Sequence, residues 1–174
     1  RSTFGKYEIL KEIARGGMGI VYKAKQEGIN RVVALKVLLS GPSSDSSQIG
    51  RFIREAKATM ALSHPNIVSI YDMGMEQGYH YFTMQYLDGG TFEKIIKDIE
   101  MPLKEKILSF AKVCRALDFA HSKKILHRDL KPANILLDQN KDPYLTDFGL
   151  AKFLDSKSAD RKSTRLNSSH GKLS

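Results

Sequence analysis

Two segments in the second half of the sequence contain side chains that could carry out phosphate chemistry. Asp129 and Asn134 lie five residues apart in HRDLKPAN, and Asp147 begins the triplet DFG. The residues between them, ILLDQNKDPYLT, have the pattern of a β-hairpin, which would place Asn134 beside Asp147. One amide and one carboxylate oxygen suit a hydrated Mg²⁺ whose other ligands are substrate phosphates. Asp129 would remain free to accept a proton from an attacking hydroxyl.

Two segments in the first half could hold the phosphates of the same substrate. The stretch Ala14–Val21, ARGGMGIV, lies between two expected strands, where glycines let backbone N–H groups approach phosphate oxygens. Lys36 follows in VALK, inside an apolar strand, and its ammonium could lie over a phosphate if a carboxylate fixed it. Glu55, on the next expected helix, is the natural partner for that lysine.

Each of these features also has a simple structural explanation. The glycines could form only a hairpin turn, Lys36 could extend its ammonium to water at a sheet edge, and Glu55 could be a solvated charge. A single aspartate near a turn is most often a cap or part of an Asx-turn. The four features in this order favour phosphoryl transfer over four separate structural roles.

Composition limits the class of protein. The chain has 174 residues, 41% hydrophobic and 27% charged, as in an ordinary soluble domain, and contains no apolar run of the roughly 18 residues that span a membrane. A single cysteine, Cys114, excludes an internal disulfide, and its helical surroundings predict a buried packing role. The net charge is +9, but the basic residues are scattered, so we expect no nucleic-acid partner.

The elements that must position these side chains follow from periodicity and turn residues. Alternating and clustered apolar residues predict a five-stranded antiparallel sheet, in which a Gln-Gly pair turns between the last two strands. One helix is expected over 49–63, with Phe52, Ile53, Ala56, Met60 and Leu62 on its apolar face, after a loop over 41–48. The expected strands are 7–14, 19–26, 31–39, 66–76 and 78–87.

The composition changes after the break at Leu87–Gly90. A short helix is expected over 92–99 and a long one over 101–123, with Pro102 in its first turn. The long helix has one apolar face, which we expect to be partly exposed for want of packing partners: Ile107, Phe110, Val113, Leu117 and Ala120.

Taken in chain order, these motifs resemble those of eukaryotic-like (Hanks-type) protein kinases over residues 5 to about 154. Lys131, two residues after Asp129, is similar to the serine/threonine branch, and RGGMGIVYKA is similar to bacterial members. The resemblance implies an α+β, two-lobe fold with a complete β-rich N-lobe and only the first part of the helical C-lobe. It divides the chain into an N-lobe (1–84), a hinge (85–90), a partial C-lobe (91–159) and a tail (160–174).

The resemblance also implies a role for each motif residue. Asp129 would be the catalytic base, Lys131 would lie near the γ-phosphate, and Asn134 and Asp147 would bind Mg²⁺. Lys36 would contact the α- and β-phosphates and pair with Glu55. The implied ATP contacts, with Met84 as gatekeeper, are Ile13, Ala14, Arg15, Gly16, Gly17, Met18, Gly19, Val21, Ala34, Lys36, Met84, Gln85, Leu87 and Leu136.

Two positions depart from the pattern of the family. Ala14 replaces the first loop glycine, which we expect to weaken nucleotide binding without abolishing it, and Gln85 replaces the usual hinge glutamate with little expected effect because the backbone meets the adenine. Arg128, before the catalytic aspartate, implies control by a phosphate on the activation loop.

The implied activity is ATP-dependent phosphoryl transfer to Ser or Thr hydroxyls of a protein substrate. The sequence contains no APE element or later helices, so we expect this chain to be an inactive fragment of a kinase whose domain is cytoplasmic and whose full-length form could be membrane-anchored. The alternative is a nucleotide-binding fragment or pseudokinase scaffold. Residues 160–170, DRKSTRLNSSH, match the translation of a sequencing-library adapter, so we expect the tail over 160–174 to be a disordered artefact.

Overall fold

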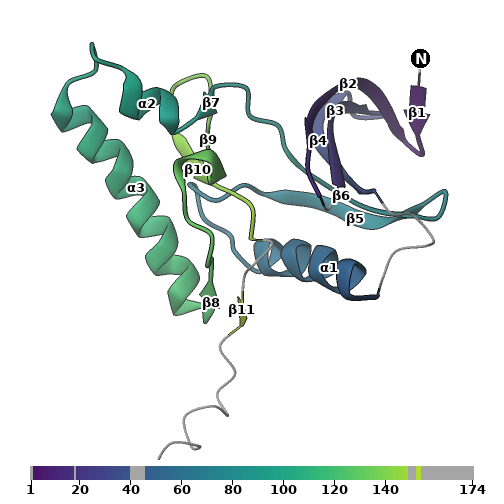
Figure 1. Cartoon of the computed structure of the whole chain (residues 1–174). Helices are drawn as coiled ribbons and strands as arrows, with labels where there is room; N and C mark the ends of the chain where they lie inside the picture. The colour runs from purple at the N-terminus through teal and green to yellow at the C-terminus, as the bar shows by residue number, and fades with distance from the viewer. Residues whose placement is uncertain (1, 18, 40–45, 149–151, 154–174) are drawn as a thin grey trace, which may run out of the picture.

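A computed structural model describes residues 2–17, 19–39, 46–148 and 152–153 of the chain (Figure 1). A curled antiparallel sheet with one helix forms one part, and two helices with small sheets form the other (Figure 1). The large sheet has the strand order β1-β2-β3-β4-β6-β5. Its strands are β1 Ser2–Phe4, β2 Tyr7–Arg15, β3 Gly19–Gln26, β4 Arg31–Leu38, β5 Ile70–Glu76 and β6 Tyr79–Gln85.

This sheet has six strands, so the expectation of five was wrong. The additional strand, β1, pairs antiparallel with β2 across a tight turn at Gly5, whose φ is +52°. Three residues are too few to show an alternating pattern in the sequence, which is why this strand was missed. The expected Gln-Gly turn between β5 and β6 is present, with positive φ at Gln77 (52°) and Gly78 (80°), as a two-residue hairpin requires.

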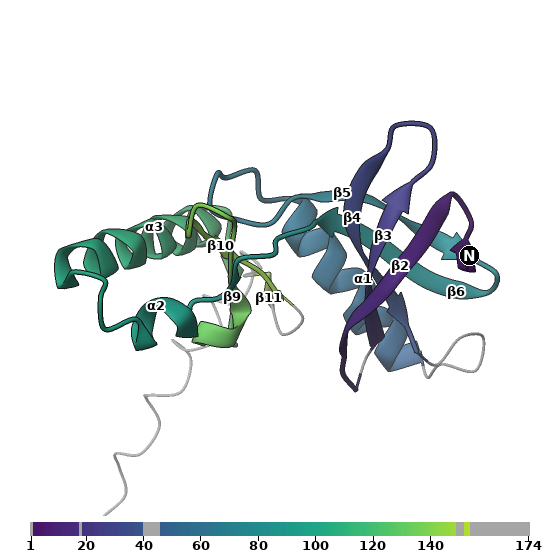
Figure 2. The same ribbon diagram turned by 90° about the horizontal axis from the view of Figure 1, so that it is seen from above.

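Helix α1, Ser46–Met60, covers one face of the sheet (Figure 2). Its Phe52 and Ala56 pack with Leu38 and Phe82 from the strands in one buried cluster. The helix begins three residues earlier and ends three residues earlier than the sequence indicated. Met60, expected on the apolar face, is 51% exposed, because it is the last residue of the helix and lies beyond the sheet contact.

The second part contains α2 and α3, and two small sheets with the strand orders β10-β9-β7 and β11-β8. Strands β9 and β10 pair antiparallel, as the hairpin pattern predicted. A buried cluster that includes Val113, Ile135 and Phe148 forms its core. The elements are β7 Gly90–Thr91, α2 Glu93–Lys97, α3 Leu103–Ser122, β8 Ile125–Leu126, the 3₁₀ turn η2 Pro132–Asn134, β9 Ile135–Leu137, β10 Pro143–Leu145 and β11 Lys152–Phe153.

Helix α3 is packed along its second half and exposed along its first. Val113 and Ala120 are buried in the core, whereas Ile107 and Phe110 are 58% and 49% exposed, which confirms that the apolar face is partly exposed. Cys114 is exposed, so its expected packing role was wrong. It follows the buried Val113 directly and is therefore turned about 100° away from the buried face.

The segment after α1 joins the two parts. Ile67 forms a parallel bridge with Leu145, the Leu145 amide donates to the Asn66 carbonyl (2.8 Å) and the Val68 amide donates to the Leu145 carbonyl (3.0 Å). Leu62, at the end of the first part, is buried in the core cluster of the second. These bonds hold β10, and therefore the segment that follows it, against the connection between α1 and β5.

No helix within residues 2–17, 19–39, 46–148 and 152–153 is both long and apolar enough to cross a membrane.

Candidate active site

Lys36 and Glu55 form a buried ion pair between β4 and α1. The Lys36 ammonium donates to both carboxylate oxygens of Glu55, at 2.7 and 2.9 Å. The two side chains are only 13% and 6% exposed, so the pair is shielded from solvent. Alternation along β4 directs Lys36 toward α1, because Leu38, two residues on, packs against Phe52 of that helix.

The electrostatics of Glu55 connect this pair to the DFG segment. Burial raises the pKa of the Glu55 carboxyl above its ordinary value, the Lys36 ammonium opposes that shift, and the Asp147 carboxylate adds to it. The repulsion places Asp147 within electrostatic range of the pair. A cation near both carboxylates would relieve that repulsion.

Asp129 and Asn134 are joined by two hydrogen bonds within one loop. The Asn134 side-chain amide donates to the Asp129 carbonyl (2.9 Å) and to its carboxylate (3.1 Å). Asn134 itself is 6% exposed at the end of η2. Because the Asn134 side-chain nitrogen makes both of these bonds, neither bond uses its side-chain oxygen, which is an atom type that can bind a metal ion.

Lys131 lies beside the same aspartate. Its ammonium is 3.6 Å from the Asp129 carboxylate, and both side chains are partly exposed, at 54% and 38%. An ion pair with that exposure contributes little to stability. The pair instead keeps the positive charge of Lys131 next to the partly exposed Asp129 carboxylate.

His127, at the start of this loop, bonds the loop to the DFG segment. Its ring accepts a hydrogen bond from the Asp129 backbone amide at Nδ1 (3.2 Å), so Nε2 carries the proton and donates to the Thr146 carbonyl (2.8 Å). The ring is 3% exposed and packs on Phe148, with the ring centroids 4.7 Å apart. His127 therefore holds the loop that contains Asp129 in a fixed position relative to Thr146, the residue before Asp147.

Asn134 and Asp147 emerge from the two ends of the β9–β10 hairpin. The Thr146 amide donates to the Asn134 carbonyl (3.0 Å), which places Asp147 one residue beyond a bond to Asn134. Asp147 and Arg128 both have a φ of +65°, a left-handed conformation that is uncommon for residues other than glycine. Such backbone strain is concentrated at functional sites.

The glycine-rich segment forms the turn between β2 and β3. The Gly16 amide donates to the Gly19 carbonyl (2.9 Å), and a methyl group added to Gly16 or Gly17 would meet nothing within 4 Å. At Gly19 the same methyl group would lie 2.5 Å from the Val37 carbonyl oxygen. Gly19 therefore allows β3 to approach β4, while Gly16 and Gly17 leave open space above the turn. Met18 lies outside the described residues.

The other expected nucleotide contacts lie on β2 to β4, on β6 and on β9. Ala34 pairs with Met84, Val21 pairs with Lys36, and Ala34 is 5% exposed. Leu136 comes from β9 of the other part, where it pairs with Thr91 and Tyr144. The Gln85 amide already donates to the Ser69 carbonyl (2.9 Å), so at Gln85 only the carbonyl remains for an adenine edge.

Two residues of the expected set lie at the exposed end of β2. The Arg15 guanidinium forms two hydrogen bonds with the Glu12 carboxylate (2.9 and 2.7 Å) at the end of β2, and Ile13 is 41% exposed on the same strand. Ala14 lies between them and pairs with Val21, while Leu87 follows β6 in the connection to β7.

The protein kinase domain family matches residues 7–170 of the chain. The chain belongs to the protein kinase family. It is 41% identical to a probable serine/threonine-protein kinase PknB of Lactococcus lactis and 40% identical to the serine/threonine-protein kinase PrkC of Bacillus subtilis, in each case over 95% of this chain. A probable serine/threonine-protein kinase of Clostridium perfringens is 38% identical over the same share. The chain spans about a quarter of the length of these relatives (27%, 26% and 24%).

These matches confirm the resemblance to bacterial serine/threonine kinases and the α+β class with a curled N-lobe sheet. The contacts of His127 with Thr146 and Phe148 were not anticipated from the sequence. His127 was part of the quoted HRDLKPAN motif, but nothing in the spacing indicated that it bridges two segments. The tail over 160–174 lies outside the described residues, so its interpretation stays a prediction.

Proposed function

We propose that this chain forms the nucleotide-binding part of a kinase that transfers the γ-phosphoryl group of ATP to Ser or Thr hydroxyls of a protein. The observation that carries the proposal is the convergence of three sequence-distant groups: the Lys36–Glu55 pair, Asp147, whose charge raises the Glu55 pKa, and Asn134, bonded to Asp129.

The phosphates of ATP would lie between the glycine turn and Lys36. The Lys36 ammonium keeps donor capacity beyond its two bonds to Glu55, and Glu55 holds it in place. The open space at Gly16 and Gly17 leaves room for phosphate oxygens beneath backbone N–H groups. The adenine would lie between Val21 and Ala34 on one side and Leu136 on the other, with the Gln85–Leu87 backbone at its edge and Met84 behind it.

The Asn134 side-chain oxygen and the Asp147 carboxylate fit one Mg²⁺, because both are oxygen donors at the two ends of one hairpin. When bound, the ion would supply positive charge against the phosphate oxygens. Lys131 would add a second positive charge near the transferred group.

Asp129 would accept the proton of the attacking hydroxyl. In the proposed step the hydroxyl oxygen forms a bond to the γ-phosphorus, the bond from that phosphorus to the β,γ-bridging oxygen breaks, and ADP leaves with the electron pair. The proton passes to the Asp129 carboxylate, whose orientation is fixed by Asn134. His127 would hold the loop in register through its two hydrogen bonds.

The test separates nucleotide binding from transfer. Binding of Mg·ATP to the 174-residue chain is measured by calorimetry, and phosphorylation is measured on the whole protein. Asp147→Ala should weaken Mg·ATP binding, whereas Asp129→Asn should leave binding within about twofold and lower the turnover by at least about 100-fold. Equal turnover in the Asp129→Asn protein would refute the role of that aspartate.

For the 174-residue chain alone we propose weak nucleotide binding without phosphotransfer. The exposed apolar side chains of α3, Ile107 and Phe110, support this, because they leave the helix that carries the catalytic loop incompletely packed. Phosphorylation of a peptide by the purified chain, abolished by Asp147→Ala, would contradict it.

A further inference from the structure

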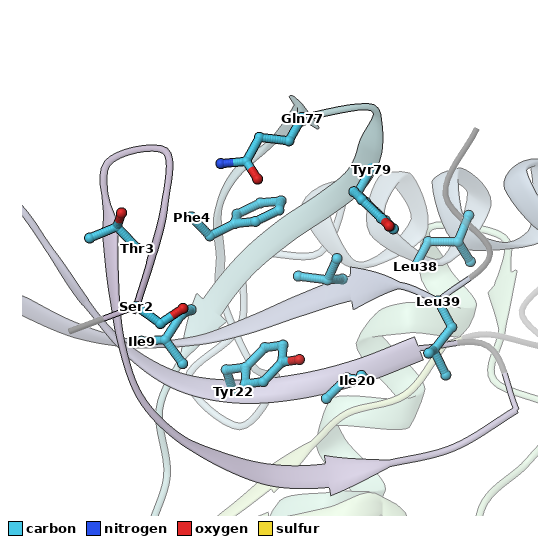
Figure 3. A pocket seen from close by; sticks show the side chains of 11 residues that line it. Ser2, Thr3, Phe4, Ile9, Ile20, Tyr22, Leu38, Leu39, Gln77 and Tyr79 are labelled. Carbon is cyan, nitrogen blue, oxygen red and sulfur yellow. The ribbon is translucent and has the colours of Figure 1, made fainter.

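A cavity of about 390 Å³ lies between the strands of the curled sheet, on the face that carries the Tyr7 and Leu35 cluster (Figure 3). Its floor is formed by β3 and β4 and its walls by β1, β2 and the start of β6. Figure 3 shows α1 behind the strands, on the far side of the sheet from the viewer. The cavity is therefore open to solvent near the N-terminal hairpin.

Val37 of β4, which lines the cavity, lies on the opposite face of the strand from Lys36. Val37 belongs to the buried cluster that contains Tyr7 and Leu35, whereas Lys36 turns toward Glu55 of α1. Successive side chains of a strand point to opposite faces, so Val37 lines the cavity while Lys36 faces the proposed nucleotide site. Leu38, at the end of β4, faces α1 as Lys36 does and also lines the cavity, whereas Lys36 itself does not.

The lining is aromatic and aliphatic. The rings of Phe4, Tyr22 and Tyr79 line the cavity together with the aliphatic side chains of Ile9 and Ile20 (Figure 3). Val37 lines it as well. Within the described part of the chain no charged side chain lines the cavity. The polar side-chain groups are four hydroxyls and one amide, from Ser2, Thr3, Tyr22, Tyr79 and Gln77.

We propose that this cavity binds an uncharged aromatic small molecule that carries one hydrogen-bonding group. Its volume of about 390 Å³ lies within the range of about 300–1,000 Å³ typical of ligand pockets. Aromatic walls favour stacked or edge-on rings, and a charged ligand would lose its hydration without gaining a counter-charge. The tyrosine hydroxyls or the Gln77 amide would pair with the single polar group.

An occupant would touch the strands that carry two proposed nucleotide contacts. Ile20 and Val37 line the cavity, and they directly follow Gly19 and Lys36 in the sequence. The inference does not depend on phosphoryl transfer, because the binding can be measured without nucleotide.

The probe for the test is N-phenyl-1-naphthylamine, a neutral aromatic amine with one N–H group, whose fluorescence rises in apolar surroundings. It is titrated into the 174-residue chain and into two matched variants. Val37→Phe fills the cavity from its floor and should weaken binding by at least about tenfold. Ile107→Phe makes a comparable aliphatic-to-aromatic change in a separate groove, beside α3, and should leave binding within about twofold.

A second measurement decides the question even if Val37→Phe fails to fold. The sequence contains no tryptophan, so Thr3→Trp, at the exposed rim, and Ile107→Trp, on α3, each introduce a single energy donor. We expect stronger energy transfer to the bound probe from position 3 than from position 107. Equal or weaker transfer from position 3, or displacement of the probe by saturating Mg·ATP, would overturn the assignment.

Discussion

The Lys36 ammonium lies 2.7 and 2.9 Å from the two oxygens of the Glu55 carboxylate, in a setting where both side chains are almost fully buried. The pair joins β4 to α1, so it reports whether the helix is docked on the sheet. Because the Asp147 charge also acts on Glu55, the same pair links the sheet to the DFG segment. Its loss should therefore affect both stability and nucleotide binding.

Removal of the lysine should be costly. Lys36→Ala leaves the buried Glu55 carboxylate without a counter-charge, and breaking such a pair typically costs about 3–5 kcal/mol. We expect the free energy of unfolding, measured by urea denaturation, to fall by about 3 kcal/mol, with some relief because Glu55 can take up a proton.

The exposed pair Lys97–Glu93 provides the control. Its atoms are 3.6 Å apart and its side chains are 78% and 50% exposed, so Lys97→Ala should change the free energy of unfolding by less than about 0.5 kcal/mol. If both alanine variants unfold at the same urea concentration, the Lys36–Glu55 pair does not hold α1 to the sheet.

The glycine turn contains one position that is needed for packing. A methyl group at Gly19 would lie 2.5 Å from the Val37 carbonyl oxygen, which is backbone and cannot move aside. Gly19→Ala should lower the free energy of unfolding by about 1–3 kcal/mol through displacement of β3 from β4. Gly17→Ala, which meets nothing within 4 Å, should leave it within about 0.5 kcal/mol in the same denaturation experiment. Equal losses in both variants would contradict the close approach.

The sequence was sufficient to predict contacts that follow from a local hairpin pattern or from the need of a buried charge for a partner. The hairpin pattern over 135–146 predicted that Asn134 and Asp147 would meet, and β9 and β10 pair as expected. Lys36 lies in an apolar strand and therefore needs a counter-charge, which is why Glu55 was assigned as its partner. The ion pair between them is present. In these cases local periodicity and charge carry the information.

The sequence was insufficient to predict contacts that depend on the curl of the sheet, or to decide which of two neighbouring helical residues is buried. Tyr7 donates to the Asp72 carboxylate (3.0 Å) across 65 residues, because the sheet curls until β2 faces β5. No local pattern contains that curl. Cys114 was misplaced because a helical face is narrow, and a shift of one residue from Val113 moves a side chain from the core to the surface.

Asp72 should give the stability of the curled sheet a dependence on pH. Burial raises the pKa of its carboxyl, but hydrogen bonds from Lys6 and Tyr7 and the charge of Lys6 outweigh burial and hold the pKa below the ordinary value of 3.8. A carboxyl with a lowered pKa in the folded state stabilises it above the unfolded pKa, and the contribution is lost as the pH falls through the folded pKa.

Asp72→Asn should therefore lower the melting temperature at pH 7, and the difference from the parent should shrink from about pH 4 downward. Asp118→Asn, on the exposed side of α3, is the matched control for the loss of one carboxylate and should leave the melting temperature at pH 7 close to that of the parent. Melting curves followed by circular dichroism between pH 3 and 7 measure the difference. A gap between Asp72→Asn and the parent that stays constant with pH would show that the carboxylate charge is not what closes the sheet.

The connection from β6 to α2 passes close to β9 at Gly89. Its amide donates to the Leu137 carbonyl (2.9 Å), and a methyl group there would lie 2.1 Å from the Asp138 carbonyl oxygen and 2.6 Å from that of Leu137. Gly89→Ala must push the connection off β9, and we expect it to lower the free energy of unfolding by about 2 kcal/mol or more. Gly50→Ala, inside α1 with nothing within 4 Å, should instead raise it by about 0.5–1 kcal/mol, because alanine favours a helix. Opposite signs in urea denaturation confirm that the connection is clamped to β9, and a stabilised Gly89→Ala chain would show that it is not.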